Sequence, residues 1–156
     1  MAVWLAALSI VFGAPSHSGC SVAAARDAVR ASTLPASFKA IALQKNAGVD
    51  RVICHDLTGD GRVDMAATVF SGGTAGDVAW VLFRRTSSGW SLAFQRLEVY
   101  KVGLFLRGTD LVESQPIYGK NDPNCCPTGG FDHIQVHWNG TRFVISRRWH
   151  TKTFKP

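Results

Sequence analysis

Five residues that can offer oxygen to a metal ion stand at every second position of one short stretch: Asp56, Thr58, Asp60, Arg62 and Asp64. Calcium loops of the D-x-[DN]-x-[DN]-G kind place hard oxygen ligands at positions 1, 3, 5, 7 and 9. If Asp56 is position 1, Arg62 offers only its backbone carbonyl. Gly61 then falls at position 6, where the chain must turn sharply. The spacing therefore predicts a Ca²⁺ site made by these five residues.

The neighbours of this loop decide which kind of calcium site it is. Ala67 stands at position 12, where an EF-hand has its bidentate glutamate, and the flanking segments have the pattern of strands. The run D-L-T-G-D-G-R-V-D-M at 56–65 resembles instead the calcium hairpin of FG-GAP and VCBS-type repeats, close to D-x-[ND]-G-D-G-x-x-D. Thr58 replaces the usual Asn or Asp, and a hydroxyl is a weaker ligand than a carboxylate. The alternative is a plain polar hairpin turn, because Asp and Gly are common turn residues.

Four cysteines are the second feature with chemistry: Cys20, Cys54, Cys125 and Cys126. In an exported chain they predict two disulfides, and the rival interpretation is a zinc site that uses all four thiolates. A bridge between the adjacent Cys125 and Cys126 needs a strained eight-membered ring. We therefore expect one of them to pair with Cys54 and the other with Cys20, although the sequence leaves all three connectivities open. Such bridges close loops of about 70 to 105 residues, and each contributes several kcal/mol.

The amino-terminal segment indicates export. Residues 1–12 form a charge-free apolar run that is too short to span a bilayer and has the length of a signal-peptide core. We expect a signal peptide at residues 1–19, a single domain at 20–156 and no transmembrane span, in a secreted or extracytoplasmic protein. The residues before Cys20 are similar to a lipobox, with His17 where a leucine is wanted. A lipid anchor on Cys20 is the alternative.

The composition is that of a globular domain with a basic surface. Of the 156 residues, 46% are hydrophobic, which excludes a disordered chain, and the formal net charge is +6. A positive surface favours anionic partners, so anionic cell-wall polymers or another envelope protein are expected to bind. The basic residues are scattered, without the interleaved aromatic residues that bind single strands. No specific nucleic-acid partner is expected.

One helix and a series of short strands must position these residues. Ser21 can cap a helix over residues 21–32, and Pro35 ends it. Alternating or β-branched patterns then predict strands at 49–54, 63–70, 78–85, 90–99, 131–138 and 142–149. A helix followed by hairpins predicts an α+β fold, in which the N-terminal helix packs on an antiparallel β-meander held by disulfides. The calcium motif occurs once, which excludes a multi-bladed propeller.

The last two strands allow a register to be predicted. With a two-residue type I′ turn at 139–140, Trp138 faces Thr141, and the numbers of every further pair sum to 279. His133 and His137 then share one face of the hairpin. They could bind zinc or copper, although a solvated polar face is the simpler interpretation.

The function is expected from these motifs together. The calcium stretch, D-P-N-C-C-P at 122–127 and W-N-G at 138–140 resemble small exported actinobacterial proteins and lipoproteins of the VCBS or LppP/LprE-like kind, most of unknown activity. No G-x-S-x-G elbow or H-E-x-x-H motif is present. Asp110 and Glu113 could form the carboxylate pair that glycosidases use. We expect a calcium-binding exported module with a binding or structural role, and the alternative is a small secreted hydrolase whose acid–base pair is hidden by the fold.

Overall fold

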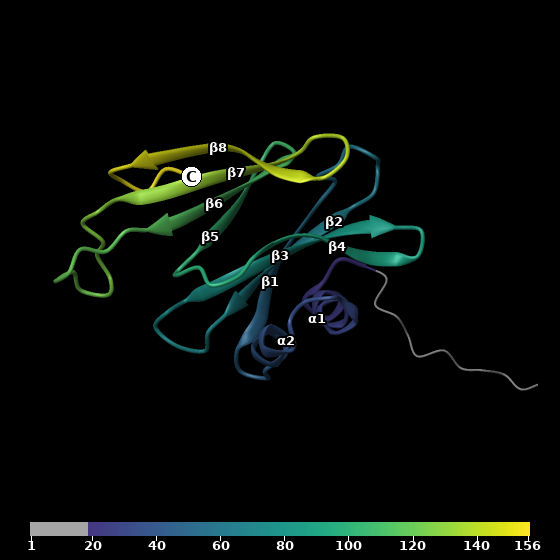
Figure 1. Ribbon diagram of the computed structural model, residues 1–156, viewed down its shortest axis with the longest axis horizontal. Helices are drawn as coiled ribbons and strands as arrows, with labels where there is room; N and C mark the ends of the chain where they lie inside the picture. The colour runs from purple at the N-terminus through teal and green to yellow at the C-terminus, as the bar shows by residue number, and fades with distance from the viewer. Residues whose placement is uncertain (1–18) are drawn as a thin grey trace, which may run out of the picture.

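Eight antiparallel strands in two four-stranded sheets follow two short helices (Figure 1). The structure, a computed structural model, describes residues 19–156. The predicted signal peptide at 1–19 lies outside the described residues, apart from Gly19. The elements are α1 (Val22–Ala31), α2 (Ala36–Ala42), β1 (Gly48–His55), β2 (Asp64–Phe70), β3 (Asp77–Thr86), β4 (Gly89–Arg96), β5 (Gly103–Arg107), β6 (Asp110–Pro116), β7 (Phe131–Trp138) and β8 (Phe143–Thr151).

The first sheet, β1–β4, lies between the two helices and the second sheet, β5–β8, so that the molecule has three layers (Figure 1). Two clusters of buried side chains fill the two interfaces. Val29 and Phe38 of the helices pack against the first sheet in one cluster. Trp80 and Leu82 of the first sheet pack against the second sheet in the other cluster. The first sheet is therefore covered on both faces.

The predicted helix is present, and its N-terminus is capped as expected. The Ser21 hydroxyl accepts a hydrogen bond from the Ala24 N–H at 3.1 Å. Arg26 extends from α1 to the free edge of β1, where its guanidinium donates to the carbonyls of Ala47 at 3.2 Å and Val49 at 2.9 Å. The second helix, α2, was not predicted. It begins directly after Pro35, whose fixed φ suits a helix start.

The predicted α+β fold with one meander is correct only in part, because half of the strands form a second sheet. The missed strands are β5 and β6. The centre of β6 carries Glu113 and Ser114, which suggest a polar loop in the sequence but are only 1% and 2% exposed in the structure. Their burial hides the strand pattern, and the chain is mostly β rather than a helix on a single meander.

Glu113 is buried between the two sheets and accepts hydrogen bonds from both of them. Trp80 of β3 donates from Nε1 at 2.6 Å. Arg96 of β4 donates from Nε at 3.0 Å and from Nη2 at 3.1 Å, and Gln115 of β6 donates from Nε2 at 2.5 Å. A buried charge is tolerated when it is paired and fully hydrogen-bonded, and these four donors meet that condition.

The last hairpin forms, but two residues away from the predicted register. Trp138 pairs with Phe143 rather than with Thr141, and the loop 139–142 joins the strands. The Asn139 Oδ1 accepts hydrogen bonds from the N–H groups of Thr141 at 3.0 Å and Arg142 at 2.9 Å. These side-chain contacts stabilise the loop in place of the expected two-residue backbone turn. The type I′ turn and the 279 register are therefore wrong. A bulge between Gln135 and Val136 adds a third residue to the shift, so that Gln135 pairs with Arg147 and the predicted pairing of Ile134 with Ile145 is also wrong.

All four cysteines are oxidised, in a pairing that differs from the expected one. Cys20 pairs with Cys54, and Cys125 pairs with its neighbour Cys126. Cys20 lies beside the end of β1, with 5.9 Å between its Cα atom and that of Cys54. Cys125 and Cys126 lie in an exposed loop. One sulfur cannot carry both a disulfide and a thioether, so this bridge and a lipid anchor on Cys20 are alternatives. No helix within residues 19–156 is long and apolar enough to cross a membrane.

Candidate metal centre

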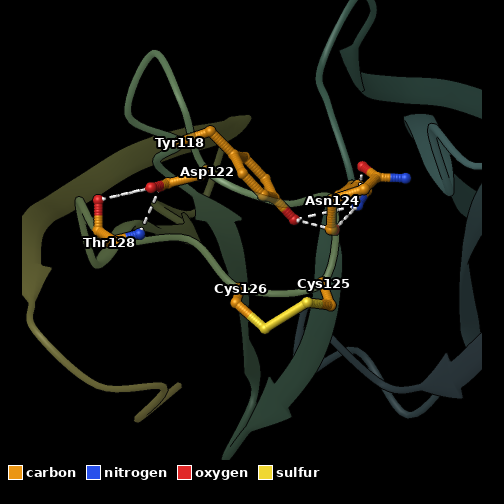
Figure 2. Close-up of a disulfide and its surroundings, with 7 residues drawn as sticks. Tyr118, Asp122, Asn124, Cys125, Cys126 and Thr128 are labelled. Atoms are coloured by element: carbon orange, nitrogen blue, oxygen red, sulfur yellow. Dashed lines mark hydrogen bonds between the residues drawn. A yellow bond between two sulfur atoms is a disulfide. The ribbon is translucent and has the colours of Figure 1, made fainter.

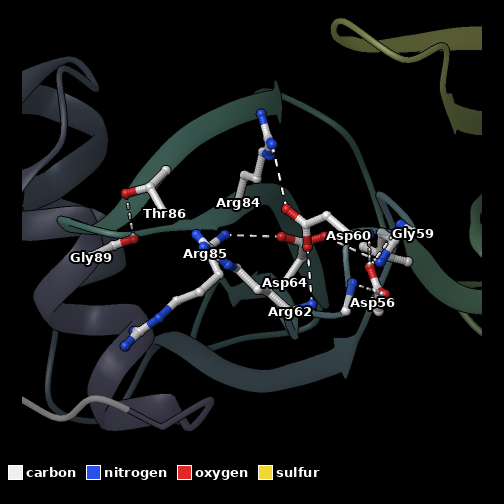
Figure 3. A network of polar contacts seen from close by, with 11 residues as sticks. Asp56, Gly59, Asp60, Arg62, Asp64, Arg84, Arg85, Thr86 and Gly89 are labelled. Carbon is white, nitrogen blue, oxygen red and sulfur yellow. Dashed lines mark hydrogen bonds and ion pairs between the residues drawn. The ribbon is translucent and has the colours of Figure 1, made fainter.

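The loop at residues 56–63 joins β1 to β2 (Figure 3). His55 and Asp64 pair across the two strands and close the loop. Gly59 and Gly61 have φ values of +74° and +78°, in the left-handed region that glycine enters without strain. The sharp turn predicted at Gly61 is therefore present, and it depends on glycine for its backbone conformation.

The Asp56 carboxylate organises the interior of the loop. Its Oδ1 accepts the N–H groups of Gly59 at 2.7 Å and Asp60 at 3.2 Å, and its Oδ2 accepts the N–H of Gly61 at 2.8 Å (Figure 3). Desolvation opposes the charged form of Asp56, but these backbone N–H groups outweigh it and hold the pKa below its usual range. Asp56 is thus an anion at neutral pH, as a calcium ligand must be.

Asp64 is fully buried at the start of β2. Its Oδ2 accepts the Leu57 N–H at 3.1 Å, and its Oδ1 accepts the Arg85 N–H at 2.9 Å. Desolvation raises the pKa of Asp64, the two N–H groups oppose that effect, and the nearby charge of Asp60 adds to the rise. The site therefore places a carboxylate where a positive charge would stabilise its ionised form.

Asp60 contacts both the loop and strand β3. Its Oδ1 accepts the Arg62 N–H at 3.0 Å, and its Oδ2 forms an ion pair with Arg84 Nη2 at 3.4 Å (Figure 3). The Arg84 guanidinium also lies 4.8 Å from the centre of the Trp138 ring in the second sheet. Arg84 is the residue that the sequence reasoning missed. The only signal was a pair of arginines ending the apolar run of β3.

The hydroxyl of Thr58, at position 3 of the loop, is buried. Its Oγ1 is shielded from solvent and, within residues 19–156, has no hydrogen bond of good geometry. It lies near enough to Asp64 to help stabilise that carboxylate. The preceding Leu57 is 2% exposed and anchors the loop in the core between the sheets. A hydroxyl that donates towards Asp64 keeps its oxygen lone pairs free for a cation, so this atom is a candidate ligand.

The five predicted ligands lie in one loop, but they do not all point towards a common centre. The donors are three carboxylates, one hydroxyl and the Arg62 carbonyl, and all of them are the hard oxygens that Ca²⁺ prefers. In the part of the chain that the structure describes, no three His, Cys, Asp or Glu side chains are grouped to hold a metal ion. Asp60 would have to rotate away from Arg84 for Ca²⁺ to be held by the whole set.

The other candidate side chains have separate partners. His133 Nε2 hydrogen-bonds Thr151 Oγ1 at 2.8 Å, whereas His137 Nδ1 meets an Asp110 oxygen at 2.7 Å, so the two histidines do not share a ligand. Asp110 therefore pairs with a histidine and not with Glu113. A His–Asp pair can act as a general base, but no hydroxyl or thiol among residues 19–156 is hydrogen-bonded to His137. The hydrolase alternative gains no nucleophile from this pair.

No protein-family model, curated protein or solved structure matches this chain.

Proposed function

We propose that the chain is an exported calcium-binding module, in which Ca²⁺ fixes the loop between β1 and β2. The observation that carries the proposal is the alternation of oxygen donors around Gly61, with the Thr58 hydroxyl at position 3 buried beside the Asp64 carboxylate. A cation at this point would take up that hydroxyl. It would also offset the repulsion between Asp60 and Asp64.

The role we assign to the site is binding or structural, because the loop lies where the three layers are connected. Cys54 is the second-last residue of β1, just before the loop, and is bridged to Cys20, two residues before α1. Arg84 contacts Asp60 in the loop and Trp138 in the second sheet. Ca²⁺ bound here would stiffen this junction. The +6 charge of the chain favours anionic cell-wall polymers or an acidic envelope protein as the partner.

Thermal unfolding in excess EDTA and in several millimolar CaCl₂ tests the proposal. We expect a Kd of about 0.1 to 1 mM, in the range of extracellular calcium modules. Several millimolar Ca²⁺ should then stabilise the native state by about 1 to 2 kcal/mol, from RT ln(1 + [L]/Kd). Mg²⁺ should stabilise less, because it dehydrates reluctantly and requires a stricter octahedral geometry.

Variants of the loop locate the effect. Asp60→Ala should abolish the calcium-dependent shift, and Asp64→Asn should weaken it, because the amide keeps an oxygen but loses the charge. Asp132→Asn is the matched control, since its side chain is 66% exposed on β7, outside the loop. Superimposed melting curves with and without Ca²⁺ would show that the loop is only a turn. An equal loss of the shift in the control would show that the ion acts through the overall charge.

A further inference from the structure

A cavity of about 470 Å³ opens beside the second sheet, and no residue of the calcium loop lines it. Its volume lies within the roughly 300 to 1,000 Å³ usual for small-molecule sites. One wall is aromatic. Phe154 of the C-terminal segment lies with its ring centre 5.3 Å from that of Phe105 and 5.3 Å from that of Phe131. A ligand entering the cavity therefore meets a continuous apolar surface.

The loop at 117–130 lines another side of the cavity, and its own contacts hold it in one shape (Figure 2). The Asp122 carboxylate accepts the N–H groups of Gly119 at 2.7 Å and Thr128 at 2.6 Å, and it also accepts the Thr128 hydroxyl. The bridge between Cys125 and Cys126 restricts the backbone between these contacts. Binding loops are typically held in one conformation by such polar contacts on the surface.

Lys101 fastens this loop to the rest of the molecule. Its ammonium donates to the Tyr118 hydroxyl at 3.0 Å, to the Asn124 Oδ1 at 2.5 Å and to the Asn124 carbonyl. Lys101 has a φ of +48°, an unfavourable backbone conformation for a residue with a side chain. The three N–H groups of the ammonium are thus occupied. Lys101 shapes the cavity, but it has no donor left for a ligand.

One other polar group at the cavity keeps unused hydrogen-bonding capacity. It is not Ser114, which lines the cavity but whose Oγ is shut off from solvent and so is not offered to a ligand. Arg51 uses one Nη2 contact, to the Asp77 carboxylate at 3.2 Å, and the described residues accept no other hydrogen bond from its guanidinium. Its side chain is 51% exposed at the cavity, so its remaining donors can reach an incoming group. A guanidinium prefers to bind carboxylate or phosphate oxygens.

We propose that this cavity is a binding site for a small amphipathic anion. Its apolar body packs against Phe105, Phe131 and Phe154, and its anionic group accepts hydrogen bonds from Arg51. The site is separate from the calcium loop and does not depend on Ca²⁺.

Phenylacetate is a suitable probe, because it combines an aromatic ring with one carboxylate, and phenylacetamide is its neutral counterpart. Each is titrated into the oxidised protein while the backbone amide signals are followed by two-dimensional ¹H–¹⁵N NMR. We expect shifts at Gly103, Ser114 and Cys125, and none at Gly59 or Gly61. Charge-assisted hydrogen bonds from Arg51 should make the acid bind about tenfold more tightly than the amide.

Three variants separate the contributions of the groups. Arg51→Gln should reduce acid binding to the level of the amide. Ser114→Ala should leave the affinity for both probes unchanged, because the Ser114 Oγ is not exposed in the cavity. Replacing Cys125 and Cys126 together by serine should weaken both probes by loosening the loop, while the Cys20–Cys54 bridge remains.

Arg147→Gln is the control, because Arg147 is an exposed arginine of β8 that does not line the cavity. If it weakened acid binding as much as Arg51→Gln, the net charge alone would attract the probe and the proposed site would be wrong. Absence of shifts at the cavity with both probes would also overturn it. Asp60→Ala should bind phenylacetate as the wild type does, so the result is distinct from that of the calcium experiment.

Discussion

The contacts of Glu113 predict an unequal cost for removing the two members of its ion pair. Arg96→Met leaves a carboxylate that is 1% exposed with hydrogen bonds only from Trp80 and Gln115. Glu113→Gln instead leaves the Arg96 guanidinium, whose side chain is 31% exposed and can be solvated. An uncompensated charge is costly only where water cannot reach it. The arginine substitution should therefore be the more damaging of the two.

The magnitudes follow from this difference in exposure. Removing one partner of a buried pair costs about 3 to 5 kcal/mol, and this range applies to Arg96→Met because Glu113 is fully enclosed. Glu113→Gln should cost about 1 to 3 kcal/mol, the loss of hydrogen bonds to a charged group that water partly replaces. For a chain of this size, a loss of 4 kcal/mol lowers the melting temperature by roughly 10 to 20 °C.

Urea unfolding followed by tryptophan fluorescence measures both costs. Arg107→Met is the control, because Arg107 is an exposed arginine on β5, and its replacement should change the stability by less than about 0.5 kcal/mol. Equal costs for the two substitutions, or a larger cost for Glu113→Gln, would refute the reasoning from exposure. Costs below about 1 kcal/mol for both would show that the pair does not hold the two sheets together.

Two further predictions concern the calcium loop. Arg84→Gln should raise the calcium affinity up to about fivefold by calorimetry, because the exposed ion pair that competes for Asp60 is worth at most about 1 kcal/mol; a weaker affinity would mean that Arg84 supports the site. Burial raises the pKa of Asp64, so the folded state holds this proton more tightly than the unfolded chain. In EDTA the free energy of unfolding of the wild type should therefore rise relative to that of Asp64→Asn as the pH falls from neutrality towards about 4. Ca²⁺ should remove this gain. A constant difference between the two free energies across that range of pH would contradict the raised pKa.

The sequence predicted best where local chemistry alone decides the structure. The hairpin around Gly61 follows from turn residues between two apolar runs, and the cap of α1 follows from Ser21. The six predicted strands end within three residues of the observed ones. These features depend on neighbours in the chain. The spacing of the candidate ligands also depends only on neighbours in the chain, whereas the direction in which each carboxylate points depends on other strands.

The misses depend on contacts between residues that are distant in the sequence. Strand β6 was missed because the burial of Glu113 is made tolerable by Trp80 and Arg96, which belong to other strands. The contact between Asp60 and Arg84 depends on the position of β3 beside β2. Hydrophobic patterns do not record such pairings, because a polar residue in a strand looks the same whether it faces water or a buried partner.

Arg26 gives the first sheet a defence against association with other chains. A strand at the edge of a sheet exposes unpaired carbonyls that can recruit a strand from another molecule. The guanidinium of Arg26 already occupies the carbonyls of Ala47 and Val49 at the free edge of β1, and it places a positive charge there. An approaching strand would have to displace this charged group before it could pair. One arginine of a surface helix thus makes strand addition at the β1 edge less favourable, whereas the opposite edge, β4, has no part in this contact.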